Sequence, residues 1–437
     1  MKLFAIENII RRSLFSCTRL LSTLSVNSDL TMNENKVTRK PRYDGRTKKR
    51  QWEERRSDKG AGLDPTLPKL MKIEQTEPIS DKIKRRKFVI LMGYSGVGYY
   101  GMQRNPNTKT VEEDLLNALL ETQFITQDSF DQVQNMHYQR AARTDKGVSA
   151  ARQVVSLKLS ENFDIAPVNE KLPEQIRLFG FKRVTKGFNA KSQCDGRTYL
   201  YVLPTIAFAD ANAICSQKDF RISDDKIKEI NDVLKLYEGT KNFHNFTSKK
   251  KAEDPSAKRF IRSFVCEPPF IKEDVEFCTL KVYGQSFMLH QIRKMVGMLL
   301  AVLRGLATQD IIIKALSTEK LNVPRAPGLG LLLDYVHYER YNYRYGEDGM
   351  HEKLTWDEVE KDVKEFKENH ILPVILDTEI KEEAMVWWLQ NKLVYHSYDD
   401  VDEKNEESDD EKNEEIDDEN NADNVKNDEF QNVVKSV

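Results

Sequence analysis

Cysteine is scarce in this sequence, which has 437 residues and contains five cysteines. None of the five forms a C-x-x-C pair, and their scatter argues against a zinc site and against a disulfide framework. We therefore expect free thiols, which are usual in a reducing compartment. The sequence also lacks an apolar run of about 18 residues, the length that a membrane-spanning helix needs, so no membrane partner is expected.

The net charge is small, at -2, but it is distributed unevenly. Residues 399–437 carry 17 acidic and 4 basic side chains, so a net charge of -13 there leaves about +11 on residues 1–398. A basic body of this kind favours a polyanionic partner, although charge that only maintains solubility gives the same pattern. The acidic segment, residues 396–437, is expected to be disordered because it cannot bury enough apolar area to offset its ordering entropy.

The N-terminal region has the composition of targeting segments. Residues 1–31 are rich in Leu and Ser and poor in acids, which predicts a mitochondrial transit peptide, with a plain disordered terminus as the alternative. A second start at Met32 would remove it, so we expect dual localisation in nucleus and mitochondrion. Residues 32–85 are predicted to be disordered and basic. Their clusters at 46–50 and 82–87 are typical of nuclear import signals or RNA-binding arms, or of a solvated linker.

Residues 86–345 show the patterns of a folded domain. Helix caps are expected at Thr110 and Ser223, and 290–304 is a strongly apolar helix. Apolar or alternating runs predict strands at 88–92, 153–159, 197–203, 259–265, 276–282 and 329–338.

The order of these elements indicates the fold class. Strands and helices intermix without regular βαβ spacing, so we expect an α+β fold with a mixed or antiparallel sheet flanked by helices. Two lobes, 86–203 and 204–345, would enclose a basic catalytic cleft. Residues 346–395 are expected to add a helical extension.

Gly96–Gly101 spells G-x-G-x-x-G directly after a predicted strand. In a dinucleotide site the helix begins within the glycine turn and presents its N-terminus to the pyrophosphate. Here Pro106 and polar residues delay the helix to about Thr110. We therefore interpret the glycines as a structural turn that lets the main chain approach a bulky ligand.

The segment Arg140–Ala150 carries the most informative pattern. It places Asp145 between Arg143 and Lys146. Opposite charges keep a carboxylate ionised, and an ionised carboxylate is a potential nucleophile. A salt-bridged surface loop would have the same composition.

This segment resembles the catalytic motif of the tRNA pseudouridine synthase A family, in the form found in its eukaryotic branch. Ala142 and Ser149 stand where bacterial members usually have glycine and histidine. Five further blocks resemble family motifs and occur in the family's order, at 94–103, 196–201, 239–246, 284–297 and 326–331. Together the blocks cover about residues 86–340.

The resemblance implies roles for three residues. Asp145 would be the nucleophile that attacks uridine, at the ribose or at the base, so that the base detaches, rotates and rejoins through carbon. Tyr199 would stack on the flipped uracil and serve as the base that removes a ribose proton. Arg293 would pair with Asp145 and lower its pKa. By residue type alone, Tyr199 also fits an ordinary strand aromatic and Arg293 a helix-surface cation.

The resemblance also implies tRNA as substrate, with small nuclear RNA and messenger RNA as further candidates, and no metal or other cofactor. The uridine would be flipped out of its stem, held by RNA contacts from the basic body. Candidate substrate-binding residues are Arg143, Lys146, Arg197, Gln103 and His290.

Two other functions compete with this interpretation. A catalytically inactive RNA-binding or RNA-folding protein would share the blocks, but we expect it to have lost Asp145, Tyr199 or Arg293. An oxidoreductase that uses a dinucleotide is disfavoured by the delayed helix. Bacterial relatives resemble dimers, whereas the extension at 353–394 would occupy that surface here, which favours a monomer over a homodimer.

Overall fold

The computed structural model describes residues 84–213 and 215–399. The predictions for the transit peptide (1–31), the start at Met32, nearly all of the basic segment (32–85) and the acidic tail after residue 399 lie outside these ranges. Within the described ranges, none of the helices has the length and apolar character needed to cross a bilayer.

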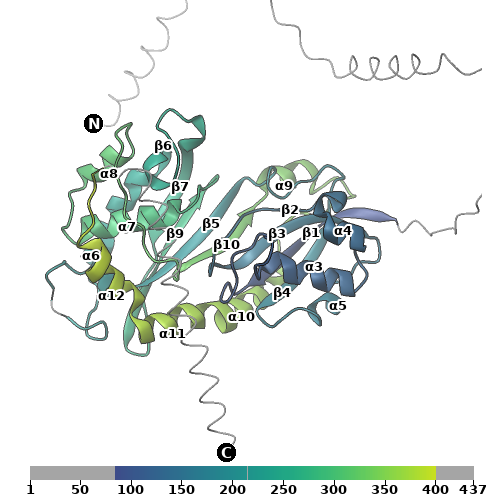
Figure 1. The fold of residues 1–437 in the computed structure, drawn as a ribbon, viewed down its shortest axis with the longest axis horizontal. Coiled ribbons are helices and arrows are strands. Elements are labelled where there is room, and N and C mark those ends of the chain that lie inside the picture. The colour runs from purple at the N-terminus through teal and green to yellow at the C-terminus, as the bar shows by residue number, and fades with distance from the viewer. Residues whose placement is uncertain (1–83, 214, 400–437) are drawn as a thin grey trace, which may run out of the picture. The chain divides into compact units, whose positions relative to one another are not determined.

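The described residues are built on one ten-stranded sheet in the order β4-β1-β3-β10-β5-β9-β7-β6, with β2 beside β3 and β8 beside β9 (Figure 1). The strands are β1 (Arg85–Tyr94), β2 (Gln139–Arg140), β3 (Ser149–Ser160), β4 (Ile176–Arg183), β5 (Gly196–Pro204), β6 (Gly239–Asn242), β7 (Lys258–Cys266), β8 (Phe270–Lys272), β9 (Val275–Gly284) and β10 (Leu331–His337). Among these strands every pairing is antiparallel except that of β10 with β3. The predicted α+β class with a mixed sheet is confirmed, as are all six predicted strands. Strands β2, β4, β6 and β8 were not predicted.

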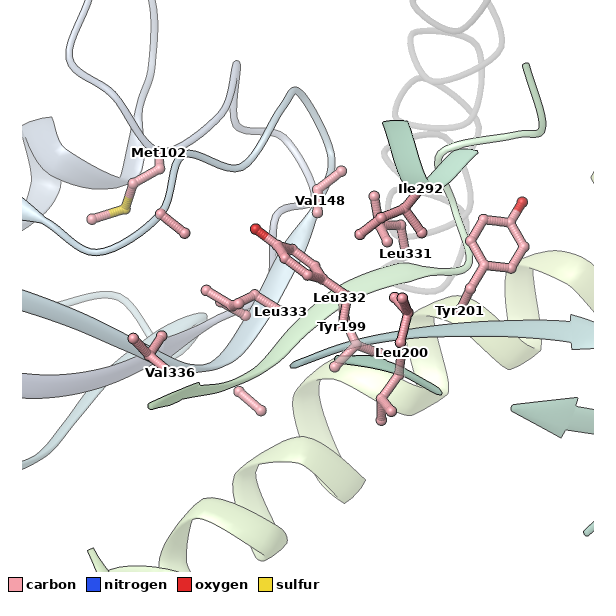
Figure 2. Packing of buried hydrophobic residues seen from close by; sticks show 14 of the residues in the cluster. Met102, Val148, Tyr199, Leu200, Tyr201, Ile292, Leu331, Leu332, Leu333 and Val336 are labelled. Carbon is pink, nitrogen blue, oxygen red and sulfur yellow. The ribbon is translucent and has the colours of Figure 1, made fainter. Parts of the chain in front are cut away.

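Strand β10 joins the strands from the two halves of the sequence. Leu333 lies opposite Ala150 of β3, in the parallel pairing, and opposite Tyr199 of β5, in the antiparallel pairing. The start of β3 and the middle of β5 are therefore level with each other across β10, although about fifty residues separate them in the chain. Figure 2 shows Tyr199, Val148 and Leu333 converging within the core at this position.

The predicted helices form where their caps indicate. The hydroxyl of Thr110 accepts a hydrogen bond from the amide of Glu113 and begins α3 (Val111–Glu121). Ser223 caps α6 (Asp224–Leu234) in the same way, and α7 (Gln291–Leu303) follows His290. The remaining α-helices are α4 (Gln127–Asp131), α5 (Ala166–Asn169), α8 (Asp310–Ala315), α9 (Glu339–Tyr345), α10 (Glu360–Phe366), α11 (Leu372–Glu382) and α12 (Ala384–Trp388).

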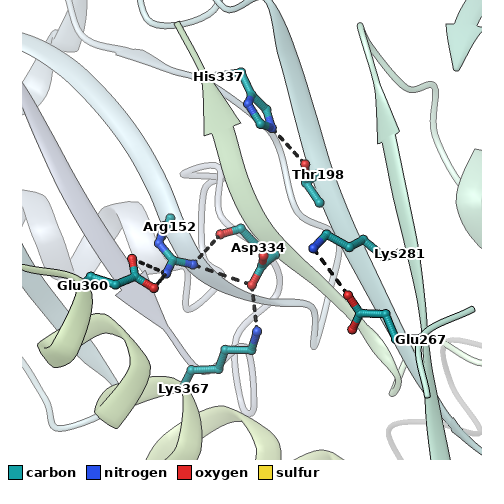
Figure 3. A network of polar contacts seen from close by, with 8 residues as sticks. All are labelled: Arg152, Thr198, Glu267, Lys281, Asp334, His337, Glu360 and Lys367. Carbon is teal, nitrogen blue, oxygen red and sulfur yellow. Dashed lines mark hydrogen bonds and ion pairs between the residues drawn. The ribbon is translucent and has the colours of Figure 1, made fainter. Parts of the chain in front are cut away.

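Residues 346–395, the predicted helical extension, contain α10, α11 and α12, which follow one another along the sheet (Figure 1). A network of charges fixes this extension to the sheet (Figure 3). Arg152 of β3 binds both carboxylate oxygens of Glu360, at 2.6 and 2.7 Å, and lies 3.7 Å from Asp334 of β10. Lys367 donates to Asp334 at 2.7 Å. The described chain ends beyond the extension, where the amide of Asn322 donates to the carbonyl of Tyr398.

Candidate active site

The loop that carries Asp145 packs directly against the glycine loop after β1. A Cβ atom on Gly96 would lie 2.6 Å from main-chain atoms of Gly147. A Cβ atom on Gly101, where φ is 94°, would lie 2.7 Å from the carbonyl oxygen of Thr144. Side chains do not fit at such distances, so the glycines permit contact between two main chains. The predicted structural turn is present, and what approaches it is the protein's own loop.

Hydrogen bonds fix the same loop. The hydroxyls of Tyr94 and Thr144 lie 2.8 Å apart, and the carbonyl of Thr144 accepts from the amide of Met102 at 3.1 Å. The side chain of Gln153, which is fully buried, binds Ala142 twice. Its Nε2 donates to the carbonyl at 3.0 Å and its Oε1 accepts from the amide at 3.2 Å. The loop is therefore positioned by main-chain and buried polar contacts on several sides.

The carboxyl group of Asp145 is mostly buried, and burial raises its pKa above the ordinary value. The positive charges of Arg293 and Arg325 oppose this increase. The sequence pointed to other cations, because Arg143 and Lys146 flank Asp145 in the chain. Burial therefore opposes the ionised state that the flanking cations were predicted to favour, and the charges of Arg293 and Arg325, which favour ionisation, come from distant segments.

The side chains of Arg143 and Lys146 have other surroundings. Arg143 is exposed to solvent. The ammonium group of Lys146 lies 4.9 Å from the ring centre of Tyr100, which is 50% exposed. Both cations thus lie next to Asp145 in the chain, Arg143 exposed and Lys146 half-buried, where an anionic ligand can reach them.

Hydrogen bonds to Ala326 hold Arg293 in place. Its Nε donates to the carbonyl of Ala326 at 2.8 Å, and the amide of Ala326 donates to the carbonyl of Arg293 at 3.2 Å. Its guanidinium group lies 3.5 Å from the point where Gly328 would carry a Cβ atom. The structure therefore brings Arg293 into electrostatic range of Asp145, as the resemblance implied.

Arg325 was not identified from the sequence. It directly precedes the Ala326–Leu331 block, and that position was the only signal for it. Its Nη1 lies 3.2 Å from Nδ1 of His290, which was predicted to contact substrate. Burial and the positive charges of Arg325, Arg293 and Lys294 lower the pKa of His290 to about 3. His290 is therefore neutral at physiological pH, and Nη1 of Arg325 lies against its ring, 3.2 Å from Nδ1 and 3.5 Å from Nε2.

Tyr199 lies on β5 with 7% of its surface exposed. Its ring contacts Phe287 edge to face, with 5.2 Å between centroids, and Figure 2 shows it between Val148 and Leu332. Burial raises the pKa of Tyr199 to about 12; Arg197 opposes this shift and Asp145 adds to it. The hydroxyl therefore carries its proton at physiological pH, and the side chain presents a neutral aromatic ring.

Two other predicted contact residues have different surroundings. Arg197 donates from Nε to the carbonyl of Ala141 at 3.1 Å and from Nη1 to that of Gln285 at 3.0 Å. It thereby links the Asp145 loop to the end of β9. Gln103 is half-buried beside Met102 of the glycine loop.

The chain is similar in sequence to known proteins. Residues 233–339 match the family described as tRNA pseudouridine synthase. The chain is 48% identical over 329 residues to the Pseudouridylate synthase 1 homolog of Mus musculus, covering 74% of this chain and 77% of that protein. It is 49% identical over 312 residues to the human protein of the same name, covering 70% and 73%. It is 32% identical over 372 residues to tRNA pseudouridine synthase 1 of Yarrowia lipolytica, covering 64% and 70%. The chain therefore belongs to the tRNA pseudouridine synthase family.

Proposed function

We propose that this protein isomerises uridine to pseudouridine in tRNA, with Asp145 as the nucleophile. The observation that carries the proposal is the convergence of three residues from separate segments. Asp145 interacts electrostatically with both Arg293 and Tyr199, which lie on α7 and β5. A protein that only binds RNA has no need for a mostly buried carboxylate facing guanidinium groups, so this arrangement favours an enzyme over an inactive binding protein.

The reaction moves one bond within a nucleotide. Asp145 attacks the flipped nucleoside, the bond between the ribose carbon and the base nitrogen breaks, and the base turns. A bond from the same ribose carbon to a base carbon then forms and the bond to Asp145 breaks, which regenerates the carboxylate. That base carbon loses its proton while the nitrogen gains one. Atoms and charge balance without an oxidant, a reductant or a second substrate.

Asp145 must be ionised to attack. Burial opposes ionisation, and Arg293 and Arg325 favour it. A carboxylate that water solvates poorly is also a stronger nucleophile than a hydrated one. The Arg293 contacts with Ala326 keep the guanidinium group in place before substrate arrives, so little reorganisation accompanies the reaction.

Tyr199 supplies a stacking surface for the flipped uracil. Its ring is held by Phe287, and its neighbours in the core are apolar (Figure 2). Stacking of a base on an aromatic side chain contributes roughly 1–3 kcal/mol. The pKa of about 12 makes the phenol a poor proton acceptor near neutral pH, so stacking is its main role in this proposal.

The RNA backbone would be held in a basic cleft between two lobes, one on each side of β10. Local charge supports this, because the exposed Arg143 and the Lys146–Tyr100 pair lie beside Asp145, while residues 84–398 together carry 46 basic and 42 acidic side chains, a net charge of +4. Binding to phosphates releases counterions, so affinity for tRNA should fall at least tenfold between about 50 and 200 mM salt. Affinity that does not change with salt would contradict the basic cleft.

The test of the proposed function uses unmodified tRNA transcript without added cofactor. Wild type, Asp145→Asn and Asp145→Ala are compared by counting pseudouridine formed, and RNA binding is measured in parallel. We expect conversion by the wild type alone and binding by all three. Conversion by the variants would show that Asp145 is not the nucleophile. Binding without conversion by the wild type would favour the inactive RNA-binding protein.

A further inference from the structure

Tyr99 and Tyr100 are adjacent in the glycine loop but have different surroundings. Tyr99 is 1% exposed, and its hydroxyl donates to the carboxylate of Asp114 on α3 at 2.6 Å. Tyr100 is 50% exposed. A buried, hydrogen-bonded ring stabilises the fold, whereas a half-exposed ring contributes less. The packing of the protein therefore accounts for Tyr99 and leaves much of the Tyr100 side chain open to a ligand.

The main chain around Tyr100 is held against the loop that carries the proposed nucleophile. On one side, the carbonyl of Tyr99 accepts a hydrogen bond from the amide of Gly147 at 3.1 Å. On the other side, a Cβ atom on Gly101 would lie 2.7 Å from the carbonyl oxygen of Thr144. Thr144 and Gly147 flank the nucleophile in the chain. Tyr100 is thus fixed beside the nucleophile before RNA arrives.

The Tyr100 ring lies next to a cation of the same loop. The ammonium group of Lys146 is 4.9 Å from the ring centre, within the range of a cation–π contact. Arg143, on the other side of Asp145 in the chain, is exposed. A single exposed aromatic side chain needs no explanation by itself. A fixed ring among cations is different, because single-stranded RNA binds such surfaces by stacking its bases and pairing its phosphates.

Tyr100 and Tyr199 lie at different depths. Tyr199 is 7% exposed and lies in the core beside Val148 (Figure 2), which suits a uracil that has left its stem. The half-exposed Tyr100 remains at the surface. When a nucleotide flips out, its neighbours lose a stacking partner and stay outside the pocket. A surface ring fixed beside Asp145 can replace that lost partner.

We propose that Tyr100 is an RNA-binding residue that stacks on a base next to the flipped uridine, while Lys146 pairs with a phosphate of the same strand. Stacking accepts any of the four bases, so the ligand is an unpaired nucleotide rather than a particular sequence. The place of this nucleotide beside the target uridine rests on the proposed function. The binding of RNA by the ring does not require conversion.

The first test measures the affinity of full-length protein for unmodified tRNA transcript over a range of salt concentrations. Tyr100→Leu removes the ring, and Tyr100→Phe retains it. Loss of one stacked base should weaken binding by at least about fivefold in Tyr100→Leu, and Tyr100→Phe should stay within about twofold of wild type. Tyr343→Leu, at a 95% exposed tyrosine of α9, is the matched control and should also stay within about twofold.

Salt dependence separates stacking from charge. The slope of log affinity against log salt should be unchanged in Tyr100→Leu, because a stacked base releases no counterions. In Lys146→Gln the slope should decrease by about one, because one phosphate contact is lost. Undiminished affinity in folded Tyr100→Leu, or equal losses in Tyr100→Leu and either Tyr100→Phe or Tyr343→Leu, would overturn the proposal.

A change in the RNA tests the partner of the ring directly. An abasic nucleotide is placed on either side of the uridine that the wild type converts. On one of the two sides it should weaken wild-type binding about as much as Tyr100→Leu does, and the two changes together should cost no more than either alone. Additive losses on both sides would overturn the proposal. If the wild type binds tRNA but converts no uridine, the proposed function fails, and the comparison of Tyr100→Leu with Tyr100→Phe still decides whether the ring binds RNA.

Discussion

Two groups of charges in this protein differ in how far they are removed from solvent. Where the C-terminal extension meets the sheet, Arg152 and Lys367 face Glu360 and Asp334, so two cations meet two acids (Figure 3). At the candidate active site, one mostly buried carboxylate faces two guanidinium groups, and its pKa is nevertheless raised. The first group lies partly in solvent, which reduces the cost of its charges, whereas burial of the second makes ionisation of its acid costly.

This difference separates stability from function. A balanced network holds two elements together and loses energy when any partner is removed. The second site retains a carboxylate in a place where ionisation is costly, which proteins maintain mainly at functional positions. The following predictions test whether the two groups respond to substitution in these opposite ways.

The largest expected effect comes from Asp145→Asn, which preserves shape and removes charge. Activity should fall by at least about a thousandfold, because an amide cannot act as the nucleophile. The protein should also become slightly more stable at pH 7, with Tm higher by about 1–3 °C. The raised pKa of Asp145 means that its ionisation costs more in the folded state than in the unfolded state, so this cost is present at neutral pH and declines as pH falls.

Calorimetry of wild type and Asp145→Asn at pH 7 and at pH 4 checks whether removal of the Asp145 charge raises Tm. The difference in Tm should be larger at pH 7. A lower Tm for the variant at pH 7 would mean that the ionised Asp145 stabilises the fold, as the charges of Arg152 and Asp334 do. The two groups of charges would then not differ in their effect on stability.

The next effect concerns the packing of the Asp145 loop. Gly96→Ala introduces a methyl group where only 2.6 Å separates it from the main chain of Gly147, so the loop must move. A displacement of about 1 Å lowers kcat by roughly 10- to 100-fold. Gly187→Ala is the matched control, because no atom lies within 4 Å of its added Cβ. Equal kcat values for the two variants would show that the glycine loop does not position Asp145.

The site illustrates what the sequence could and could not predict. Local signals were sufficient for the caps at Thr110 and Ser223 and for the alternation along β5. The family blocks indicated Asp145, Tyr199 and Arg293, and the structure brings these three into electrostatic contact. These predictions depend on neighbours in the chain or on the order of motifs, which the sequence displays directly.

Other features depend on packing between distant segments. The sequence placed Arg143 and Lys146 beside Asp145, but the charges that act on its carboxyl group come from Arg293 and Arg325. Arg325 becomes relevant only because Gly297 lets its segment lie against α7. The register of β10 against β3 and β5 sets the start of β3 level with the middle of β5. This register likewise depends on packing between distant segments.

The structural group of charges should respond mainly in stability. Arg152→Met leaves Asp334 without one of its cations and frees Glu360, and we expect a loss of about 1–3 kcal/mol of unfolding free energy, reduced from the fully buried case because Glu360 is partly exposed. The kcat of folded protein should be unchanged. Lys228→Met, which removes an exposed pair with Asp225, serves as control and should cost less than about 0.5 kcal/mol. A large decrease in kcat for Arg152→Met would show that the two groups are coupled.

The smallest effect concerns Glu379, a buried acid of the extension. Burial, assisted by the charges of Glu383 and Glu382, raises its pKa to about 8, and its carboxyl oxygens accept from the amide of Met385. Because the folded-state pKa is raised, Glu379 stabilises the fold at pH 5 relative to pH 8, and this contribution is lost as pH rises through 8. Glu379→Gln cannot ionise and retains one acceptor, so its Tm relative to wild type should increase by about 1–3 °C per pH unit between pH 5 and pH 8. A constant difference would mean that Glu379 is ionised throughout, and the extension would then contain an unbalanced charge without any catalytic use for it.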